Sequence, residues 1–336
     1  MPETDIRSLV DAANARYTDP ERNVIINGVP GQTPRFELYH FSLSLCSMKV
    51  RGVFAEKEAA YTSHDIDILP PGMQNYFPEY ARLRLAGGRD LVGNMVNGYT
   101  GRSSTETEGF DPLVVPTLVD HEAGKILVNS KKMCLYLDAE IDTGTRLVPT
   151  DIAAAVIRQV DIVDQTPHPA VLYGSHPDGD NRPDFIQHDM PGIHDRKIAE
   201  ARHNMAQVGN DPLLISAYEH KILKESAAKA HVNDVQKMRA SVQEFKDIVG
   251  QLEKDLSHGD EWIMGERFTL ADVVWAVSLF RIQWLGLGYI WKAGDDIVLP
   301  RVHEYTKRTF ARPSFVAATI RWPRNPPSPH VMEYYQ

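Results

Sequence analysis

The sequence predicts two structural classes in one chain, an α/β domain followed by an all-helical domain. Signals for short strands and for helices alternate over residues 35–140, which is typical of an α/β domain. Strand signals stop near residue 150, and residues 235–256 then repeat apolar side chains at spacings of three and four. That repeat predicts one long amphipathic helix. A length of 336 residues also suggests two domains.

The first domain begins with the aromatic and apolar segment RFELYHF (35–41), which predicts a strand. Apolar residues at helical spacing follow Cys46 and predict a helix, and residues 63–69 predict a second strand. Two apolar runs flank the turn-prone DHEAGK and predict a hairpin at 118–128, followed by a helix that Ser130 could cap. The order β-α-β, then β-β-α, is that of a thioredoxin-like domain.

Two patterns in the second half support an all-helical domain. The apolar repeat at 235–256 could form a dimeric coiled coil, but so short a repeat inside a globular chain favours a helix packed in a bundle. Thr269 and Asp272 have the spacing of a capping box, which predicts the start of a further helix.

These patterns also predict the domain boundaries. They give an N-terminal extension (1–34), a thioredoxin-like domain (35–140), a linker (141–150) and a helical domain (151–336). Two segments rich in Gly, Ser, Thr or Pro, 85–110 and 165–212, are expected to be insertions. Long loops in compact domains are often functional lids or disordered, and composition alone does not distinguish these for 85–110.

The composition excludes several classes of protein. A net charge of −9 argues against a nucleic-acid binder, although a local basic pocket for a small anion remains compatible with it. Because the sequence has no apolar run long enough to span a membrane and no secretory signal, we expect a cytoplasmic protein. Cys46 and Cys134 lie far apart without zinc-ligand spacing, so no metal site is expected.

Cys46 is the first candidate for chemistry, because it lies at the start of a predicted helix. Exposed amides and the helix dipole there stabilise a thiolate, and Lys49 and Arg51 would add positive charge if they face it. The alternatives are a buried structural cysteine and a solvated basic face of the helix. Cys134 lies on an apolar helix face, which favours core packing.

Two further features suit a small peptide. A cis bond between Val115 and Pro116 would turn the Val115 backbone outward, where it could pair with a peptide. The amides that follow Ser130 form a helix N-terminus suited to a carboxylate. A thiolate, a backbone edge and a carboxylate site together fit a small anionic thiol peptide.

The segments that carry these features resemble the cytosolic glutathione transferases. The segments are SLSLCSMK, VVPTLV, the NS before a helix, and FTLADVVWAV after the capping box. CSMKVR and YFPEYARLR are more similar to the glutathione-dependent reductive dehalogenases of chlorinated hydroquinones. The resemblance implies glutathione as co-substrate, a small chlorinated aromatic substrate and a homodimer.

The resemblance also implies roles for individual residues. Cys46 would be the catalytic thiol, with Ser44 in the same loop. The glutathione-binding residues would be Lys49, Val115, Pro116, Asn129 and Ser130, with Val115 pairing with the cysteinyl backbone and Ser130 holding the γ-glutamyl carboxylate. Many relatives carry an acidic residue where Asn129 stands, so the grip on the γ-glutamyl amine is lost or supplied elsewhere.

The expected activity is reductive removal of chloride from a chlorinated hydroquinone or a chlorogentisate, through a glutathionyl conjugate and a Cys46–glutathione mixed disulfide. The alternatives are a transferase or isomerase that does not oxidise glutathione, and a non-catalytic glutathione-binding redox protein. In a lid at 85–110, Met95, Val96 and Tyr99 could cover an aromatic ring, and Arg89 or Arg102 could meet a phenolate or carboxylate. His168, Tyr173 and His176 are expected to be loop residues rather than catalytic acids.

Overall fold

A five-stranded mixed sheet forms the centre of the first domain. The computed structural model describes residues 5–29, 31–143, 146–256 and 259–335. The strand order is β1-β3-β2-β4-β5, and only β2 and β3 are parallel neighbours. The strands are β1 (Asn23–Ile26), β2 (Phe36–His40), β3 (Tyr61–Asp65), β4 (Thr117–Asp120) and β5 (Lys125–Leu127).

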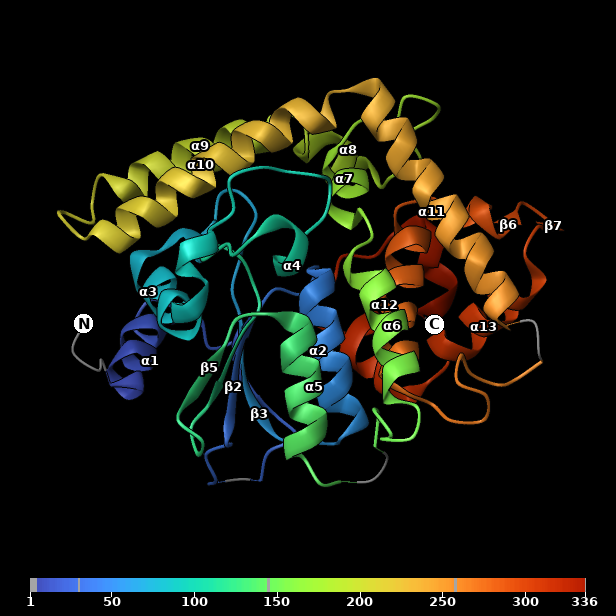
Figure 1. Cartoon of the computed structure of the whole chain (residues 1–336), viewed down its shortest axis with the longest axis horizontal. Coiled ribbons are helices and arrows are strands. Elements are labelled where there is room, and N and C mark those ends of the chain that lie inside the picture. The colour runs from blue at the N-terminus through green and yellow to red at the C-terminus, as the bar shows by residue number, and fades with distance from the viewer. Residues whose placement is uncertain (1–4, 30, 144–145, 257–258, 336) are drawn as a thin grey trace.

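Helices cover both faces of this sheet. On one face lie α2 (Leu45–Glu56) and α5 (Ser130–Glu140), and on the other lie α1 (Ile6–Asn14) and α3 (Pro78–Gly87) (Figure 1). Side chains that alternate along β2 enter the two cores, with Leu38 in the core that includes α2 and α5 and Tyr39 in the core that includes α1 and α3. This is the thioredoxin-like arrangement that the sequence predicts.

The N-terminal segment contributes to the sheet, which the sequence did not predict. β1 pairs antiparallel with β3, with Val24 opposite Ser63, and therefore adds a fifth strand at the edge. Val24 and Ile25 are 40% and 52% exposed, so β1 lacks the buried alternation that indicates a strand. The second strand ends at Asp65 rather than at residue 69, and the proline pair Pro70–Pro71 follows soon after it.

In the described part of the second domain, helices are joined by turns, and one short hairpin is formed by β6 (Lys292–Ala293) and β7 (Asp296–Ile297). Its helices are α6 (Ala153–Asp164), α7 (His168–Tyr173), α8 (Asp184–Asp189), α9 (Ile193–Met205), α10 (Pro212–Val232), α11 (Val235–Asp255), α12 (Leu270–Trp284), α13 (Pro300–Phe310) and α14 (Pro313–Phe315). Short 3-10 and π segments occur in both domains. In the first they are Gln74–Tyr76 and Arg89–Asn94, and in the second they are Gly288–Ile290, Val316–Ile320 and Pro329–Tyr334.

The predicted signals of this domain are found in α11 and α12. Met238, Phe245 and Leu252 of α11 are buried within the chain, so the apolar repeat is a bundle seam. The capping box of Thr269 and Asp272 starts α12, whose side chains are almost all buried. α12 packs against α6, α13 and α2, and it therefore joins the helical domain to the helix that carries Cys46.

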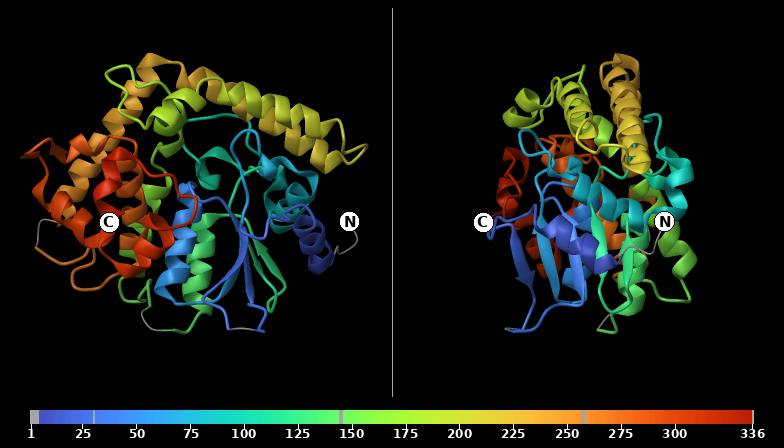
Figure 2. Two further views of the ribbon diagram at one scale, coloured as in Figure 1. Left: turned by 180° about the vertical axis from the view of Figure 1, so that it is seen from behind. Right: turned by 90° about the vertical axis from the view of Figure 1, so that its left-hand side faces the viewer.

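The segment 165–212 is mainly helical, not a long loop. It contains α7, α8 and α9, and α9 then pairs with α10 in a long helical hairpin. This hairpin extends across the top of the α/β domain, where α10 contacts α3 (Figures 1 and 2).

The segment 85–110 is a compact loop rather than a disordered one. Its first residues complete α3, and it also contains the short helix α4 (Thr105–Glu108). A bridge between Met95 and Phe110 closes its base. Gly109 has φ of 92°, and a side-chain carbon there would lie 2.8 Å from the Asn94 carbonyl oxygen, so this position requires glycine.

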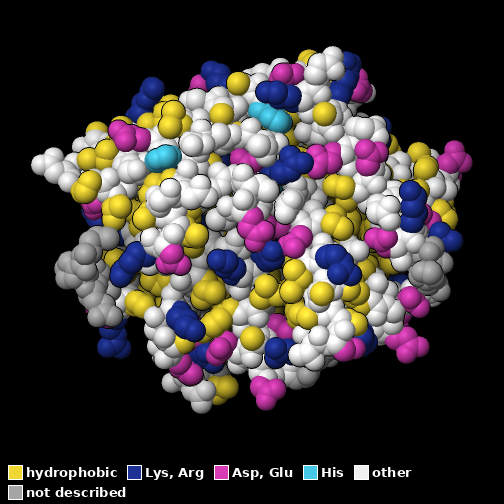
Figure 3. Space-filling view, viewed as in Figure 1, with side chains coloured by type: hydrophobic (Ala, Val, Ile, Leu, Met, Phe, Trp, Pro, Cys, Tyr) yellow, Lys and Arg dark blue, Asp and Glu magenta, His cyan; other side chains and the backbone are white. Residues whose placement is uncertain are grey.

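The surface carries mixed charge on the face seen in Figure 3, where basic and acidic side chains are interspersed. Among the residues that the structure describes, no helix combines the length and apolar character needed to cross a bilayer.

Candidate active site

Cys46 lies in the first turn of α2, and its side chain is partly exposed. The helix begins after Ser44, whose hydroxyl oxygen accepts a hydrogen bond from the Ser47 amide at 3.3 Å. The Cys46 Sγ lies 3.8 Å from the Ser103 Oγ of the 85–110 segment. Cys134 is buried, and burial raises the pKa of its thiol to about 12. Cys46 is therefore the accessible thiol, as the sequence predicts.

Lys49 and Arg51 both point into the protein, so the hypothesis of a solvated basic face is wrong. They are 2% and 1% exposed. Lys49 pairs with Asp164 of α6 at 3.3 Å and does not line the cavity that contains Cys46. Burial alone would lower the pKa of Lys49, but the charge of Asp164 raises it, so the ammonium stays charged. Arg51 donates to the carbonyls of Phe41 and Ser42 and holds the chain that precedes Cys46.

Arg281 of α12 is a cavity residue that sequence reasoning missed. It is buried, lines the same cavity as Cys46, and donates a hydrogen bond to the Leu43 carbonyl. Burial lowers the pKa of its guanidinium to about 10. Within the described chain no carboxylate forms an ion pair with Arg281, and its Nε has no partner. The sequence feature that could have identified Arg281 is its position as a lone arginine within the largely apolar segment LADVVWAVSLFRIQW.

The backbone edge at Val115 has the predicted cis bond to Pro116. Both residues line the cavity, and β4 begins directly after them. Neither the N–H nor the C=O of Val115 has a hydrogen-bond partner among the residues that the structure describes. Both groups can therefore pair with an extended peptide.

The start of α5 differs from the prediction in one respect. Asn129, not Ser130, is the N-cap, and its side-chain oxygen accepts from the Lys132 amide at 2.9 Å. Ser130 is the first residue of the helix and lines the cavity beside Asn129. Its hydroxyl is consequently not used as the cap and can reach a ligand.

The 85–110 segment supplies part of the cavity wall through Tyr99 and the residues 102–105, 108 and 109. Met95 and Val96 are buried but do not line the cavity, so the expectation that they cover a ring is wrong. Arg89 is exposed and away from the cavity. Arg102 does line it, although it also pairs with Glu244 at 2.6 Å.

Helix α7 lines part of the cavity with His168, Pro169, Leu172 and Tyr173. His168 is buried and lies 3.1 Å from the Ser278 hydroxyl, and burial lowers its pKa well below the ordinary value, so the ring is neutral. His168 and Tyr173 are helical rather than in a loop, whereas His176 lies after α7 and bonds the Val171 carbonyl at 2.8 Å.

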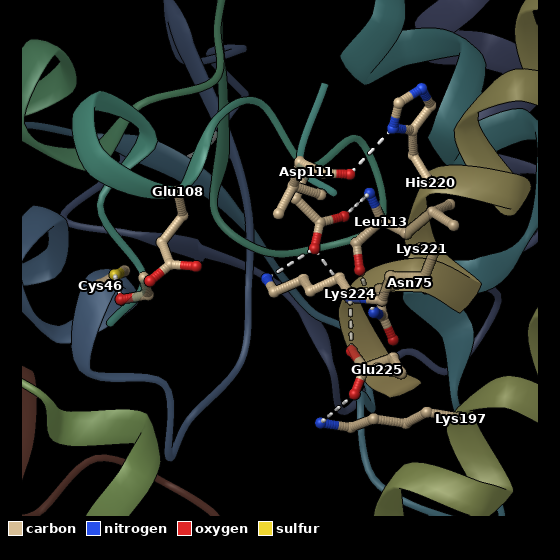
Figure 4. Close-up of polar contacts among 12 residues, drawn as sticks. Cys46, Asn75, Glu108, Asp111, Leu113, Lys197, His220, Lys221, Lys224 and Glu225 are labelled. Atoms are coloured by element: carbon tan, nitrogen blue, oxygen red, sulfur yellow. Dashed lines mark hydrogen bonds and ion pairs between the residues drawn. The ribbon is translucent and has the colours of Figure 1, made fainter. Parts of the chain in front are cut away.

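The wall opposite Cys46 is formed by α9 and α10. Lys197 of α9 and Lys221, Lys224 and Glu225 of α10 line the cavity together with Asp111 (Figure 4). Sequence reasoning did not identify these residues, because they are distant in the chain and show no motif.

The comparisons with known proteins identify the family of this chain. The model of the glutathione S-transferase C-terminal domain matches residues 228–308. The chain is 50% identical over 300 residues to the 2,5-dichlorohydroquinone reductive dechlorinase of Sphingobium indicum, covering 89% of this chain and 86% of that protein. This chain belongs to the glutathione transferase superfamily. It is accordingly an enzyme, and glutathione is its co-substrate.

The more distant matches are one sequence relative and two solved structures that share the fold. The tetrachloro-p-hydroquinone reductive dehalogenase of Sphingobium chlorophenolicum is 25% identical over 297 residues, covering 85% of this chain and 96% of that protein. The structure of β-etherase LigF from Sphingobium sp. strain SYK-6 matches with a TM-score of 0.56 at 17% identity, covering 84% of this chain and 97% of LigF. Glutathione transferase F7 from Populus trichocarpa matches with a TM-score of 0.51 at 15% identity, covering 84% and 97%.

Proposed function

We propose that this glutathione transferase superfamily member is a reductive dehalogenase that removes chloride from a chlorinated hydroquinone or a related dihydroxyaromatic, such as a chlorogentisate. The observation that carries the proposal is an accessible cysteine thiol at the start of α2, inside a cavity with an unpaired backbone edge. The 50% identity to a named reductive dechlorinase supports the same reaction class.

Glutathione binding is assigned to the α/β side of the cavity. Val115 pairs through its backbone with the cysteinyl residue, and Ser130 and the first amides of α5 hold the γ-glutamyl carboxylate. Asn129 contributes by fixing the start of this helix. Lys49, which the resemblance places among the glutathione-binding residues, has no contact with glutathione in this arrangement, because its ammonium is paired with Asp164 and does not line the cavity.

The reaction begins with the aromatic ring in its quinoid enone tautomer. A glutathione thiolate adds to the carbon that bears chlorine, and chloride leaves with its bonding electron pair. The Cys46 thiolate then attacks the glutathionyl sulfur, and the carbon–sulfur bond breaks. The ring carbon keeps that electron pair and takes a proton, which leaves a Cys46–glutathione mixed disulfide.

A second glutathione completes the cycle by thiol–disulfide exchange. It restores the Cys46 thiol and releases glutathione disulfide. For each chloride released, two glutathiones are oxidised to one disulfide, and the two electrons convert a carbon–chlorine bond into a carbon–hydrogen bond. This stoichiometry distinguishes the dehalogenase from a transferase or an isomerase, which oxidise no glutathione.

In the test, the protein is incubated with glutathione and a panel of chlorinated hydroquinones and gentisates. The amounts of halide and glutathione disulfide that form are then measured. We expect one disulfide per chloride for the native protein. Cys46→Ala should stop reduction and accumulate the glutathionyl–aromatic conjugate, because the first step does not need this thiol. Cys134→Ala is the matched control and should keep the chemistry.

Three outcomes would contradict the proposal. Chloride release without glutathione disulfide would indicate a transferase. Glutathione binding without chloride release would indicate a non-catalytic redox protein that binds glutathione. Dechlorination by Cys46→Ala at the native rate would exclude the thiol role.

A further inference from the structure

The cavity wall opposite Cys46 contains a buried cluster of charges, and Figure 4 shows the ends of Lys197 and Lys224 pointing toward the side where Cys46 lies. Asp111 Oδ2 pairs with Lys221 Nζ at 2.9 Å and with Lys224 Nζ at 2.8 Å. Glu225 Oε1 pairs with Lys221 Nζ at 3.1 Å.

Positive charge exceeds negative charge in this cluster. Three lysines share the two carboxylates of Asp111 and Glu225. Lys197 is the lysine in surplus, because its Nζ lies 3.8 Å from Glu225 Oε2, which already bonds His194 Nδ1 at 2.7 Å. Burial lowers the pKa of His194, so the neutral ring adds no positive charge to the cluster.

Lys197 is 8% exposed, and its Nζ lies 3.9 Å from the centre of the Tyr173 ring. Burial would lower the pKa of Lys197, but the charge of Glu225 raises it, so the ammonium stays charged. A buried charge without full compensation is costly, and an anionic ligand in the cavity would remove that cost.

The wall around Lys197 is aromatic as well as basic. Tyr76, Tyr99 and Tyr173 line the same cavity, and their rings suit a flat substrate. The residues that suit glutathione are Val115 and Ser130. They belong to the α/β domain, on the other side of the cavity from Lys197. The surplus ammonium therefore faces the part of the cavity that remains for the second substrate.

We propose that Lys197, supported by Lys221 and Lys224, forms an oxyanion subsite that takes a phenolate oxygen of the aromatic substrate. The inference rests on the proposed function and specifies its substrate as a deprotonated dihydroxyaromatic. Binding transfers the phenolic proton to solvent and places the oxygen against the ammonium groups. The same chemistry could serve the glycyl carboxylate of glutathione, and the experiment distinguishes these two sources.

The probe is 4-nitrophenol, whose phenolate absorbs visible light, so its protonation when bound is read directly by a pH titration. The full-length protein should lower the pKa of the bound probe by about one unit or more relative to the free probe. Lys197→Met should abolish this shift, whereas Lys197→Arg should keep it because the charge is retained.

Lys229→Met is the matched control, because Lys229 is an exposed lysine of the same hairpin that pairs with Asp195 at 2.8 Å. It should keep the full shift. Glutathione affinity, measured by calorimetry in every variant, should not change.

A bound probe that titrates like the free probe in the native protein would overturn the subsite. A loss of glutathione affinity in Lys197→Met, with the probe unaffected, would assign the lysine to the glycyl carboxylate instead. Since the probe releases no halide, a shifted probe together with failed dechlorination would reject the proposed function and leave the subsite standing.

Discussion

At the scale of single residues, position in the fold decides what the two cysteines can do. Cys46 and Cys134 both lie on helices next to the sheet, but only Cys46 opens onto the cavity, while burial raises the pKa of Cys134 to about 12. The cations Arg281 and Lys49 likewise differ in their bonding partners. Lys49 has a carboxylate partner, whereas Arg281 bonds a backbone carbonyl beside Cys46. Arg281 is thus a cation on the Cys46 side of the cavity that is available to a thiolate there.

The role of Ser130 is testable through affinity. Ser130→Ala removes a hydrogen bond to a charged carboxylate, which is typically worth about 1.5–3 kcal/mol. We expect glutathione binding to weaken by about 10- to 100-fold, measured by isothermal calorimetry. The helix itself should remain, because Asn129 is its cap. An unchanged affinity would show that the γ-glutamyl carboxylate is bound elsewhere.

At the scale of elements, Asp111 connects the loop before β4 to helix α10. Lys221 and Lys224 of α10 both bond its Oδ2, and its Oδ1 accepts from the Leu113 amide at 2.9 Å. Asn75 donates to the Leu113 carbonyl at 2.7 Å and secures the same loop. The loop that leads into Val115 is therefore held against the helical hairpin that crosses the α/β domain.

The ion pairs of Asp111 predict a pH-dependent contribution to stability. Burial would raise the pKa of Asp111, but the charges of Lys221 and Lys224 hold it well below its usual range. A carboxylate with a depressed pKa stabilises the folded state above its unfolded pKa of about 4, and this contribution is lost as the pH falls further. Asp111→Asn should lower the free energy of unfolding at pH 7 by about 3 kcal/mol, because Lys224 then lacks its carboxylate partner and Lys221 keeps only Glu225.

The measurement is urea unfolding of the native protein and of Asp111→Asn between pH 3 and pH 7. The difference in the free energy of unfolding between the two proteins should become smaller below pH about 4, where the carboxylate of the unfolded chain binds a proton. Asp178→Asn is the control, since Asp178 pairs with Arg239 on the surface and should show little effect. A difference that is constant over the whole range would exclude the charge as its cause.

At the scale of the whole molecule, the cavity lies between the domains and belongs to neither alone. The α/β domain supplies Cys46, Val115 and Ser130, and the helical domain supplies Arg281 and the lysines of α9 and α10. The 85–110 segment lines a further part of the cavity. Since Met95 and Phe110 close the base of that segment, the part that can act as a lid is residues 97–108.

Replacing residues 97–108 with a short Gly-Ser linker tests the lid. We expect a folded protein that binds glutathione as before, because Val115 and Ser130 lie outside the segment. Turnover of the aromatic substrate should fall by about a hundredfold, because Tyr99 no longer positions the ring and water enters. Full dechlorination by the shortened protein, measured as chloride release, would exclude the lid.

The sequence by itself determined the features that depend on local chemistry and periodicity. The helix start at Cys46, the capping box at Thr269 and the buried seam of α11 each follow from a few neighbouring residues. A short segment carries enough information for these, because capping bonds and apolar spacing act within one or two turns.

Only the tertiary structure decided which distant residues share the cavity. β1 is a strand because β3 offers it an edge, and Lys49 is buried because α6 brings Asp164 to it. The charge cluster joins Asp111 to residues of α9 and α10 that lie about a hundred positions further along the chain. No local pattern encodes such a contact, because it forms only when the helical hairpin packs across the α/β domain.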